Sequence, residues 1–347
     1  MQSLRHLLEK RYVMVLAGDV IPVLSPLAVV PPREEGQGIL LGVDDKGRNI
    51  YLNPYSLPNV HGVILGTSGS GKSTLSRHII LEAREKGVKA WVIDPHGEEA
   101  YKRLFDNSIK MTVDKINILS IPGWSHEEYA SELSRYIELI YAYYGSRNVI
   151  RKLILRCLKE GSLSPMEKFV DEDPDISRLY DDLIRIHGDA PTIAELSDRD
   201  IYFYFPTMVS QEIGRLSIQV LLLLLQGYRR SQGVKKRLEQ IIILEEAHLF
   251  SKYLLSLYKE IRKWGYSLIA ISQLPREFDI RLYQLAGFVL VLSGSESYIR
   301  DIAALFSITN DEKDHVLFAS RGTALFFRQG DPRPRKVFLR IREEAFS

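Results

Sequence analysis

A glycine-rich loop is the stretch of this sequence whose residue types indicate chemistry most directly. Residues 66–73 read GTSGSGKS and fit the pattern G-x-x-x-x-G-K-[ST] at every fixed position. Glycines let the backbone curl so that its N–H groups and the N-terminus of a following helix form a phosphate site. We therefore predict a nucleoside triphosphate site, with Lys72 on the outer phosphates and the Ser73 hydroxyl on Mg²⁺. The residues expected to contact the nucleotide are Gly66, Ser68, Gly69, Ser70, Gly71, Lys72, Ser73 and Thr74, and we expect Thr74 near the inner phosphates.

Two adjacent carboxylates supply the second half of the expected chemistry. Residues 241–250, IIILEEAHLF, are a run of aliphatic residues that ends at Glu245 and Glu246. Because Mg²⁺ takes oxygen ligands and one or two carboxylates, we predict that Glu245 holds the ion, directly or through water. Hydrolysis also needs a group that orients and deprotonates the attacking water, and Glu246 is placed for that role. Without the glycine loop, a pair of surface carboxylates at a strand end would be the simpler interpretation.

The segments around these motifs predict an α/β domain that brings them together. The apolar runs 61–65 and 88–94 flank a helical stretch after the glycine loop, which is typical of a parallel βαβ unit, and this context argues against a chance match. Further strands are expected at 240–245, 267–272 and 287–292, with hairpins at 38–53 and near the C-terminus. Helices are expected at about 125–200, where S/T-x-x-E capping boxes start at Ser125, Ser164 and Thr192, and a long buried helix covers 210–230. We expect a small β-rich region at 1–55 and an ATPase domain at 56–347.

Composition narrows the class of protein but not its partner. The 347 residues are 45% hydrophobic and 26% charged, with a formal net charge of +2 and a single cysteine, Cys157. A cysteine-based metal site and an intramolecular disulfide are therefore excluded, and no global field attracts nucleic acid. Residues 12–32 are apolar but interrupted by glycine, proline and aspartate, so we expect short strands there instead of a membrane span. A native chain that begins earlier, with a membrane segment, stays an alternative.

The order of the motifs resembles a known family. About 170 residues separate Lys72 from Glu245, and neither an N-K-x-D nor an L-S-G-G-Q motif is present. The chain resembles the HerA/FtsK superfamily of hexameric P-loop motors, and most closely HerA-like ATPases and conjugation-type (type IV secretion) ATPases. This resemblance covers about residues 38–345 and implies a RecA-like fold with a mainly parallel sheet. The matching pieces are HGVILGTSGSGKS (61–73), VIDPHGE (92–98), LEEAH (244–248), IRKWG (261–265) and ISQLP (271–275).

The resemblance implies roles for residues that the motifs alone leave open. Arg262 matches the arginine of an R-x-x-G motif and is expected to act as an arginine finger on a neighbouring subunit's nucleotide; the alternative is a helix-end arginine. Gln273 is expected to sense the γ-phosphate or hold the water, and otherwise is a strand-end glutamine. Asp94 either orients the site through water or forms a turn, and we interpret His96 and His248 as structural. The sequence departs from the family pattern in LEEAH, where D-E-A-H is usual, and in SQLP, where S-Q-R-P is commoner.

We expect a ring-forming, hexameric ATPase that uses ATP and Mg²⁺ to translocate double-stranded DNA. A type IV secretion-type ATPase that moves or assembles protein subunits is the main alternative, and a kinase is a third. The basic run 228–237, YRRSQGVKKR, is interpreted as a solvated face or as a DNA contact, and the acidic run 171–175 as a solvated connection. We expect a cytoplasmic protein that is recruited to a nuclease or to a membrane secretion or transfer partner.

Overall fold

The computed structural model describes residues 38–53, 59–141, 147–205, 210–235, 237–317 and 322–346. Residues Ile39–Ser347 form one compact unit. The short strands expected at 12–32 lie outside the described residues. Everything below concerns the described part of the unit that begins at Ile39.

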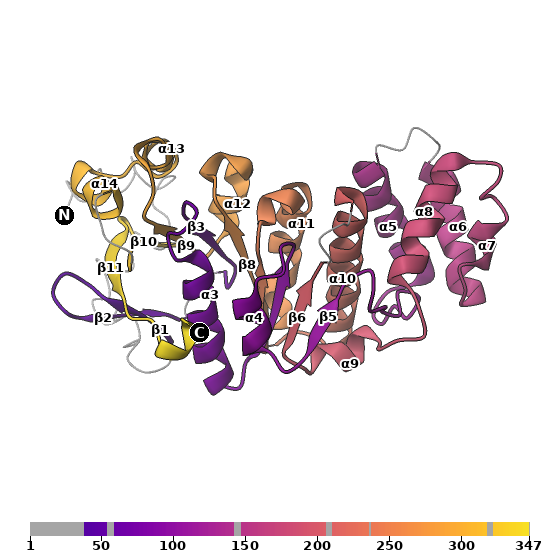
Figure 1. Cartoon of the computed structure of the whole chain (residues 1–347), viewed down its shortest axis with the longest axis horizontal. Helices are drawn as coiled ribbons and strands as arrows, with labels where there is room; N and C mark the ends of the chain where they lie inside the picture. Colours follow the sequence, from indigo (N-terminus) through magenta and orange to yellow (C-terminus); the bar gives the residue numbers. More distant parts are fainter. Residues whose placement is uncertain are drawn as a thin grey trace, which may run out of the picture. The chain divides into compact units, whose positions relative to one another are not determined.

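A single 11-stranded sheet organises this unit, in the order β2-β1-β11-β10-β9-β3-β8-β7-β4-β6-β5 (Figure 1). The strands from β9 to β5 run parallel, and β10, β11, β1 and β2 continue the sheet with antiparallel pairs. The predicted α/β fold with a mainly parallel sheet is therefore confirmed. The strands are β1 Ile39–Val43, β2 Asn49–Leu52, β3 Gly62–Leu65, β4 Lys89–Asp94, β5 Ser108–Lys110, β6 Ile201–Tyr204, β7 Gln240–Leu244, β8 Tyr266–Ser272, β9 Phe288–Leu292, β10 Thr323–Arg328 and β11 Arg335–Leu339.

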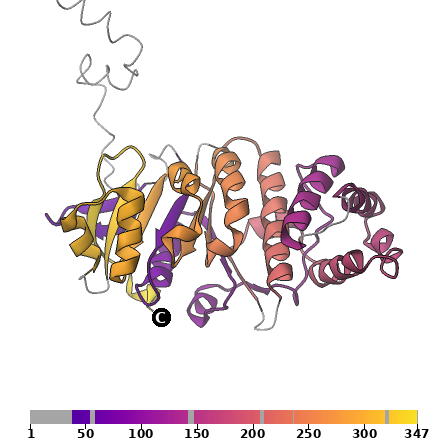
Figure 2. The same ribbon diagram turned by 90° about the horizontal axis from the view of Figure 1, so that it is seen from above.

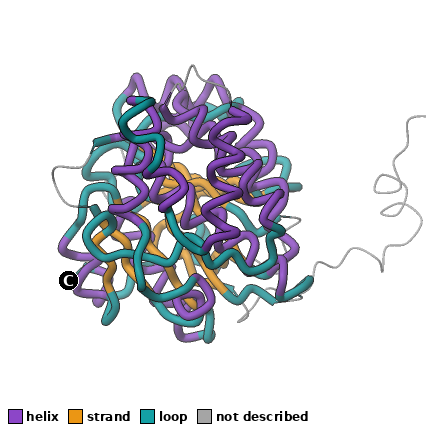
Figure 3. Tube along the Cα trace, turned by 90° about the vertical axis from the view of Figure 1, so that its right-hand side faces the viewer, coloured by secondary structure: helices purple, strands orange, loops and turns teal. Residues whose placement is uncertain are grey.

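Helices pack on both faces of the sheet, as Figures 1 and 3 show. Helix α3 belongs to the core on one face, and helices α10, α11 and α13 belong to the core on the other. The α-helices are α3 Lys72–Glu85, α4 Glu99–Leu104, α5 His126–Tyr141, α6 Arg147–Glu160, α7 Ser164–Glu167, α8 Pro174–Ile186, α9 Ile193–Ser197, α10 Gln211–Ser231, α11 Ser251–Glu260, α12 Ile280–Leu285, α13 Glu296–Phe306 and α14 Asn310–Leu317. Short 3₁₀ helices are η2 Ala247–Phe250, η3 Ile261–Trp264, η4 Pro275–Glu277 and η5 Glu343–Ala345.

Strand β7 illustrates why the central strands read as continuous apolar runs. Successive side chains of a strand point to opposite faces of its sheet. Ile241 and Ile243 enter the core on the α3 face, whereas Ile242 and Leu244 enter the core on the α10 face. A strand that is covered on both faces has no solvent side, so its sequence shows no alternation of apolar and polar residues. The carboxylates that follow Leu244 therefore lie at the edge of the sheet, directly after a strand that is buried on both faces.

Two hairpins form the antiparallel end of the sheet. Strands β1 and β2 pair across a turn in which the Asp44 carboxylate accepts hydrogen bonds from the backbone N–H groups of Lys46 and Arg48, both at 2.9 Å. Strands β10 and β11 form the second hairpin, and β11 also pairs with β1. Both predicted hairpins are confirmed. The first one continues the central sheet, while the domain boundary expected at residue 55 falls within residues 54–58, outside the described part.

A group of helices, α5 to α9, lies between β5 and β6 in the chain and packs against α10 (Figures 1 and 2). Two of the three predicted capping boxes are present, because Ser125 and Glu128 exchange hydrogen bonds, as do Thr192 and Glu195. The third prediction is wrong. Ser164 is the first residue of α7, a single turn that ends at Glu167, and its hydroxyl lies 2.8 Å from the hydroxyl of Ser162.

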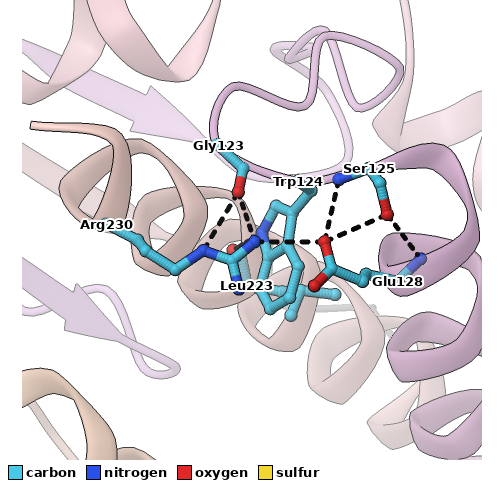
Figure 4. A network of polar contacts seen from close by, with 6 residues as sticks. All are labelled: Gly123, Trp124, Ser125, Glu128, Leu223 and Arg230. Atoms are coloured by element: carbon cyan, nitrogen blue, oxygen red, sulfur yellow. Dashed lines mark hydrogen bonds and ion pairs between the residues drawn. The ribbon is translucent and has the colours of Figure 1, made fainter.

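Helix α10 is the long buried helix expected at 210–230, and it begins after a Ser210 cap. Its C-terminal end is tied to the start of α5 by Arg230, whose guanidinium donates to the Gly123 carbonyl and to Glu128 (Figure 4). The same guanidinium lies 4.3 Å from the centre of the Trp124 ring, and the Trp124 indole N–H donates to the Leu223 carbonyl. Within the described residues, no helix combines the length and the apolar character that crossing a membrane requires.

Candidate functional site

The glycine-rich loop connects β3 to α3 and presents backbone N–H groups. Gly69 and Gly71 have φ angles of 75° and 97°, in the region that side chains other than glycine rarely adopt. Helix α3 starts at Lys72 without a side-chain cap, so its first-turn N–H groups have no partner from a capping side chain. These N–H groups form the kind of site that binds phosphate oxygens. The amine of Lys72 is buried and donates to the carbonyl of Thr67 at 3.1 Å.

Gly66 has a different role from the rest of the loop. It does not line the cavity described below. A Cβ atom at this position would lie 2.4 Å from Ser70 Oγ and 2.9 Å from Leu292 Cβ. Because real Cβ atoms do not approach other atoms so closely, the turn out of β3 requires glycine here. Gly66 therefore shapes the loop and does not lie where a ligand in the cavity would contact it.

The remaining predicted groups converge on this loop because of the strand order β3-β8-β7-β4. The carboxyl ends of parallel strands meet at one edge of a sheet. Gln273 follows β8, Glu245 and Glu246 follow β7, and Asp94 ends β4. Four neighbouring strands thus bring side chains from four distant parts of the chain to one edge.

Glu245 is the most strongly perturbed carboxyl group of the site. It is 5% exposed, and burial raises its pKa to about 8. The hydroxyl of Tyr101 donates a hydrogen bond to Glu245 Oε1, and the charge of Lys72 also opposes this rise in pKa. Burial in turn lowers the pKa of Lys72, while Glu245, Glu246 and Glu98 oppose that change. At neutral pH the isolated Glu245 carboxyl therefore carries a proton that a bound cation would displace.

Glu246 is held in an unusual backbone conformation. Its φ is 46°, a left-handed value that costs a non-glycine residue about 1 kcal/mol or more. The amide of Gln273 donates to Glu246 Oε1 at 2.8 Å. The Nδ1 atom of His248 lies 3.2 Å from Glu246 Oε2 and 3.3 Å from Glu277 Oε2. Local strain supported by side-chain contacts is typical of positions where function dictates the direction of a side chain.

Ser73 faces a carboxylate that the sequence analysis did not single out. Its hydroxyl donates to Glu98 Oε1 at 3.1 Å, and both residues line the same cavity. Asp94 builds the turn that carries Glu98, because its carboxylate accepts the backbone N–H groups of His96 and Glu98. Tyr202 donates a further hydrogen bond to Asp94 at 2.8 Å. These contacts favour the turn-forming interpretation of Asp94.

One cavity of about 790 Å³ lies at this edge of the sheet. Seven of the eight residues predicted to contact nucleotide line it, together with Glu245, Glu246 and Gln273. Arg262 lies on η3, and its side chain is outside the described part of the chain, so its predicted role is not placed. The cavity is also lined by residues to which the sequence analysis gave no role: Arg77, Glu98, Gly322, Leu339, Arg340, Ile341 and Phe346.

The donor set suits a nucleotide with Mg²⁺. No group of three or more His, Cys, Asp or Glu side chains that could enclose a metal ion occurs in the described residues. Mg²⁺ in nucleotide sites does not need such a group, because it keeps several waters and binds phosphate oxygens plus one or two carboxylates. The Ser73 hydroxyl and the buried Glu245 carboxyl beside the phosphate loop meet this requirement.

Solved structures with the same fold belong to P-loop ATPases. VirB4 of Thermoanaerobacter pseudethanolicus is 18% identical, with a TM-score of 0.69 over 90% of this chain and 99% of that chain. The unbound bacterial conjugative coupling protein TrwB is 15% identical, with a TM-score of 0.63 over 90% of each chain. TrwB in complex with ADP and Mg²⁺ is 18% identical, with a TM-score of 0.51 over 84% of this chain and 86% of that chain. The predicted RecA-like fold is thereby confirmed.

Sequence comparison identifies the family. An uncharacterized protein of Aquifex aeolicus (strain VF5) is 29% identical over 75 residues, which are 21% of this chain and 26% of that protein. This chain therefore matches about a quarter of the length of that relative. The family model described as the central domain of the helicase HerA matches residues 38–220, just over half of the chain. The chain belongs to this family and is a HerA/FtsK-type P-loop ATPase.

Proposed function

We propose that this protein is a ring-forming ATPase that hydrolyses ATP and uses the energy to translocate double-stranded DNA. The observation that carries the proposal is the convergence of the phosphate loop, Glu245, Glu246 and Gln273 around one cavity. These groups follow the carboxyl ends of three neighbouring strands: the loop follows β3, Gln273 follows β8, and both glutamates follow β7. Such an arrangement can bind a triphosphate and activate a water molecule beside it.

The roles of the residues follow from their surroundings. The N–H groups of the loop and Lys72 bind the phosphates, and Ser73 with Glu245 provides oxygen ligands for Mg²⁺. Bound Mg²⁺ would neutralise charge that develops on the phosphates. Glu246 accepts the proton of the attacking water, and the hydrogen bond from Gln273 keeps one of its oxygens in a fixed direction. Glu98, which contacts Ser73, steers that hydroxyl.

Phosphoryl transfer commonly uses an arginine that neutralises charge in the transition state. Two arginines, Arg77 of α3 and Arg340 of the segment after β11, line the cavity of one chain, and Arg77 donates to the carbonyl of Ala345 at 2.9 Å. Neither follows β7 or β8, the strands that carry Glu246 and Gln273. A neighbouring subunit that supplies Arg262 would complete the site, and this motivates a closed, hexameric ring. The ring is therefore part of the proposed mechanism and not only of the proposed architecture.

The basic run 228–237 bears on the choice between DNA and protein as the transported polymer. Two arginines of the basic run 228–237 serve internal contacts: Arg229 is buried and pairs with Glu239 at 3.0 Å, and Arg230 binds Gly123 and Glu128. This use of the basic run favours a second candidate, a secretion-type ATPase that moves or assembles protein subunits in the cytoplasm beside a membrane partner. For DNA, the contact would instead come from a few basic residues repeated around the ring. A nuclease is then an expected partner.

ATP hydrolysis with and without double-stranded DNA, across a protein concentration series and at two salt concentrations, tests the proposal. A DNA-translocating ring should show a steep dependence on protein concentration and a stimulation by DNA that weakens as salt rises, because phosphate contacts release counterions. A hydrolysis rate that depends steeply on protein concentration but does not respond to DNA would support the secretion-type candidate. Absence of hydrolysis in every condition would contradict both.

A further inference from the structure

Two chemically different sets of residues line the candidate nucleotide cavity. Lys72, Glu245 and Glu246 are charged, and a segment near the C-terminus contributes mainly apolar side chains together with one arginine. This segment, Leu339–Phe346, lines the cavity through Leu339, Arg340, Ile341 and Phe346. A nucleotide has the same division, because its phosphates are charged and the faces of its base are apolar.

Arg77 connects the segment to the phosphate-binding end of α3. Its guanidinium donates to Thr74 Oγ1 at 3.4 Å and to the carbonyl of Ala345 at 2.9 Å. Thr74 is the loop residue expected near the inner phosphates, while Lys72 reaches the outer ones. Since the base follows the inner phosphate in a nucleotide, the segment beside Thr74 lies on the side where the base would extend.

The segment is fixed in place before any ligand binds. The backbone N–H of Arg340 donates to the carbonyl of Leu41 at 3.0 Å, and that of Arg342 donates to His78 Nδ1 at 3.3 Å. Ala345 is fully buried. A wall that is ordered in advance loses little conformational entropy when a ligand contacts it.

Phe346 is the exception within this anchored segment. It follows the buried Ala345, yet 67% of its surface is exposed. Among the described aromatic residues, none forms a ring contact with it. A large apolar ring thus lines a polar cavity without an aromatic partner from the protein.

We propose that Leu339–Phe346 is the base-binding wall of the nucleotide site and that Phe346 stacks on the nucleobase. This inference rests on the proposed function, because it presupposes that a nucleotide binds the loop. The occupant is a planar nucleobase, since stacking needs only a π face and the segment contributes no hydroxyl, amide or carboxylate side chain to the cavity lining. Phe346 is thus a binding residue for the base, while the phosphate groups depend on Lys72.

Binding of two probes to the full chain tests this inference: ADP with Mg²⁺, and inorganic tripolyphosphate with Mg²⁺, which has no base. Phe346→Ala should weaken ADP binding by about 5- to 20-fold, the lower part of the range for base–aromatic stacking, and leave tripolyphosphate binding within about twofold. Phe346→Tyr, which keeps the ring, should bind ADP like the wild type. Phe338→Ala is the matched control, because this exposed phenylalanine of β11 contacts His315 and does not line the cavity.

The outcomes separate the inference from the function on which it rests. If Phe346→Ala binds ADP normally, or loses both probes equally, the base-binding wall is wrong while the phosphate site stands. Lys72→Ala should lose both probes. If the wild-type protein binds neither probe, the proposed function fails and the inference fails with it.

Discussion

At the scale of single residues, burial decides the chemistry of Glu245. Removal of a carboxylate from water disfavours its charged form, and here this effect outweighs the hydrogen bond from Tyr101 and the charge of Lys72. In the proposed nucleotide site, a neutral carboxyl would not repel incoming phosphates, and bound Mg²⁺ would favour its ionised form. Glu246, by contrast, is oriented by Gln273 and lies next to His248.

The raised pKa of Glu245 predicts a pH dependence of stability in the absence of Mg²⁺ and nucleotide. The folded protein binds this proton more tightly than the unfolded chain. The resulting contribution to the free energy of unfolding is therefore complete below about pH 4.5 and is lost as the pH rises towards 8. Relative to Glu245→Gln, the free energy of unfolding of the wild type should fall across this window by up to about 1.4 kcal/mol per pH unit. Urea unfolding of both proteins in EDTA at several pH values measures the difference, and parallel curves would show that Glu245 does not titrate as described.

Some of the site could be predicted from sequence and some could not, for a physical reason. The loop and the glutamate pair lie in continuous motifs, because a tight phosphate turn and a strand end each need neighbouring residues. Tyr101 and Glu98 were missed, since their partners Glu245 and Ser73 are 144 and 25 residues away in the chain. Only the folded strand order brings such pairs into contact. Nothing in the sequence near Phe346 marks it as part of a cavity.

At the scale of elements, the central strands were predictable because burial on both faces produces apolar runs. Their order was not, since the pairing of β3 with β8 joins Gly62 to Ile269 across most of the chain. The failure at Ser164 has a local cause: Leu163 occupies the N-cap position of α7, so Ser164 is already the first residue of the helix and cannot cap it. The S/T-x-x-E spacing therefore does not fix the residue at which a helix begins.

The junction between α10 and α5 gives a test at this scale. Arg230→Ala removes the contacts to Gly123, Glu128 and Trp124 and should lower stability by about 1 kcal/mol, through lost packing as well as lost charge. Arg300→Ala on α13 is the control, because Arg300 and its partner Glu296 are both largely exposed, and it should change stability by less than about 0.5 kcal/mol. Thermal unfolding measures both effects. Unchanged stability of Arg230→Ala together with lost DNA binding would instead assign this arginine to a DNA contact.

At the scale of the whole molecule, the proposed mechanism depends on contacts between chains. In the proposed mechanism, the cavity of one chain supplies the groups that bind the phosphates, the metal and the water, while Arg262 acts on the site of a neighbour. A residue that acts on a neighbouring subunit can restore activity when two inactive variants assemble together, whereas a residue that acts within its own chain cannot. Mixed assemblies of two inactive variants therefore test the ring directly.

Equal amounts of Arg262→Ala and Lys72→Ala protein should recover roughly a quarter of the wild-type rate, the share of interfaces in which an intact loop meets an intact finger. A mixture of Glu246→Gln with Lys72→Ala is the control and should recover nothing, because both changes disable a group of the same chain's site. ATP hydrolysis after co-assembly gives the measurement. No recovery of the first mixture at any ratio would remove the support for Arg262 as a finger in trans.

The most direct test of the central claim is ATP binding and ATP hydrolysis by Glu246→Gln, measured side by side. The side chain keeps its size and its place next to Gln273 but cannot accept the proton of water. We expect ATP affinity within a few-fold of the wild type and a rate lower by about 10²- to 10⁴-fold, the usual contribution of a general base. Glu127→Gln, at an exposed position of α5, should behave like the wild type. Normal hydrolysis by Glu246→Gln would contradict the assignment of this edge of the sheet as the catalytic site.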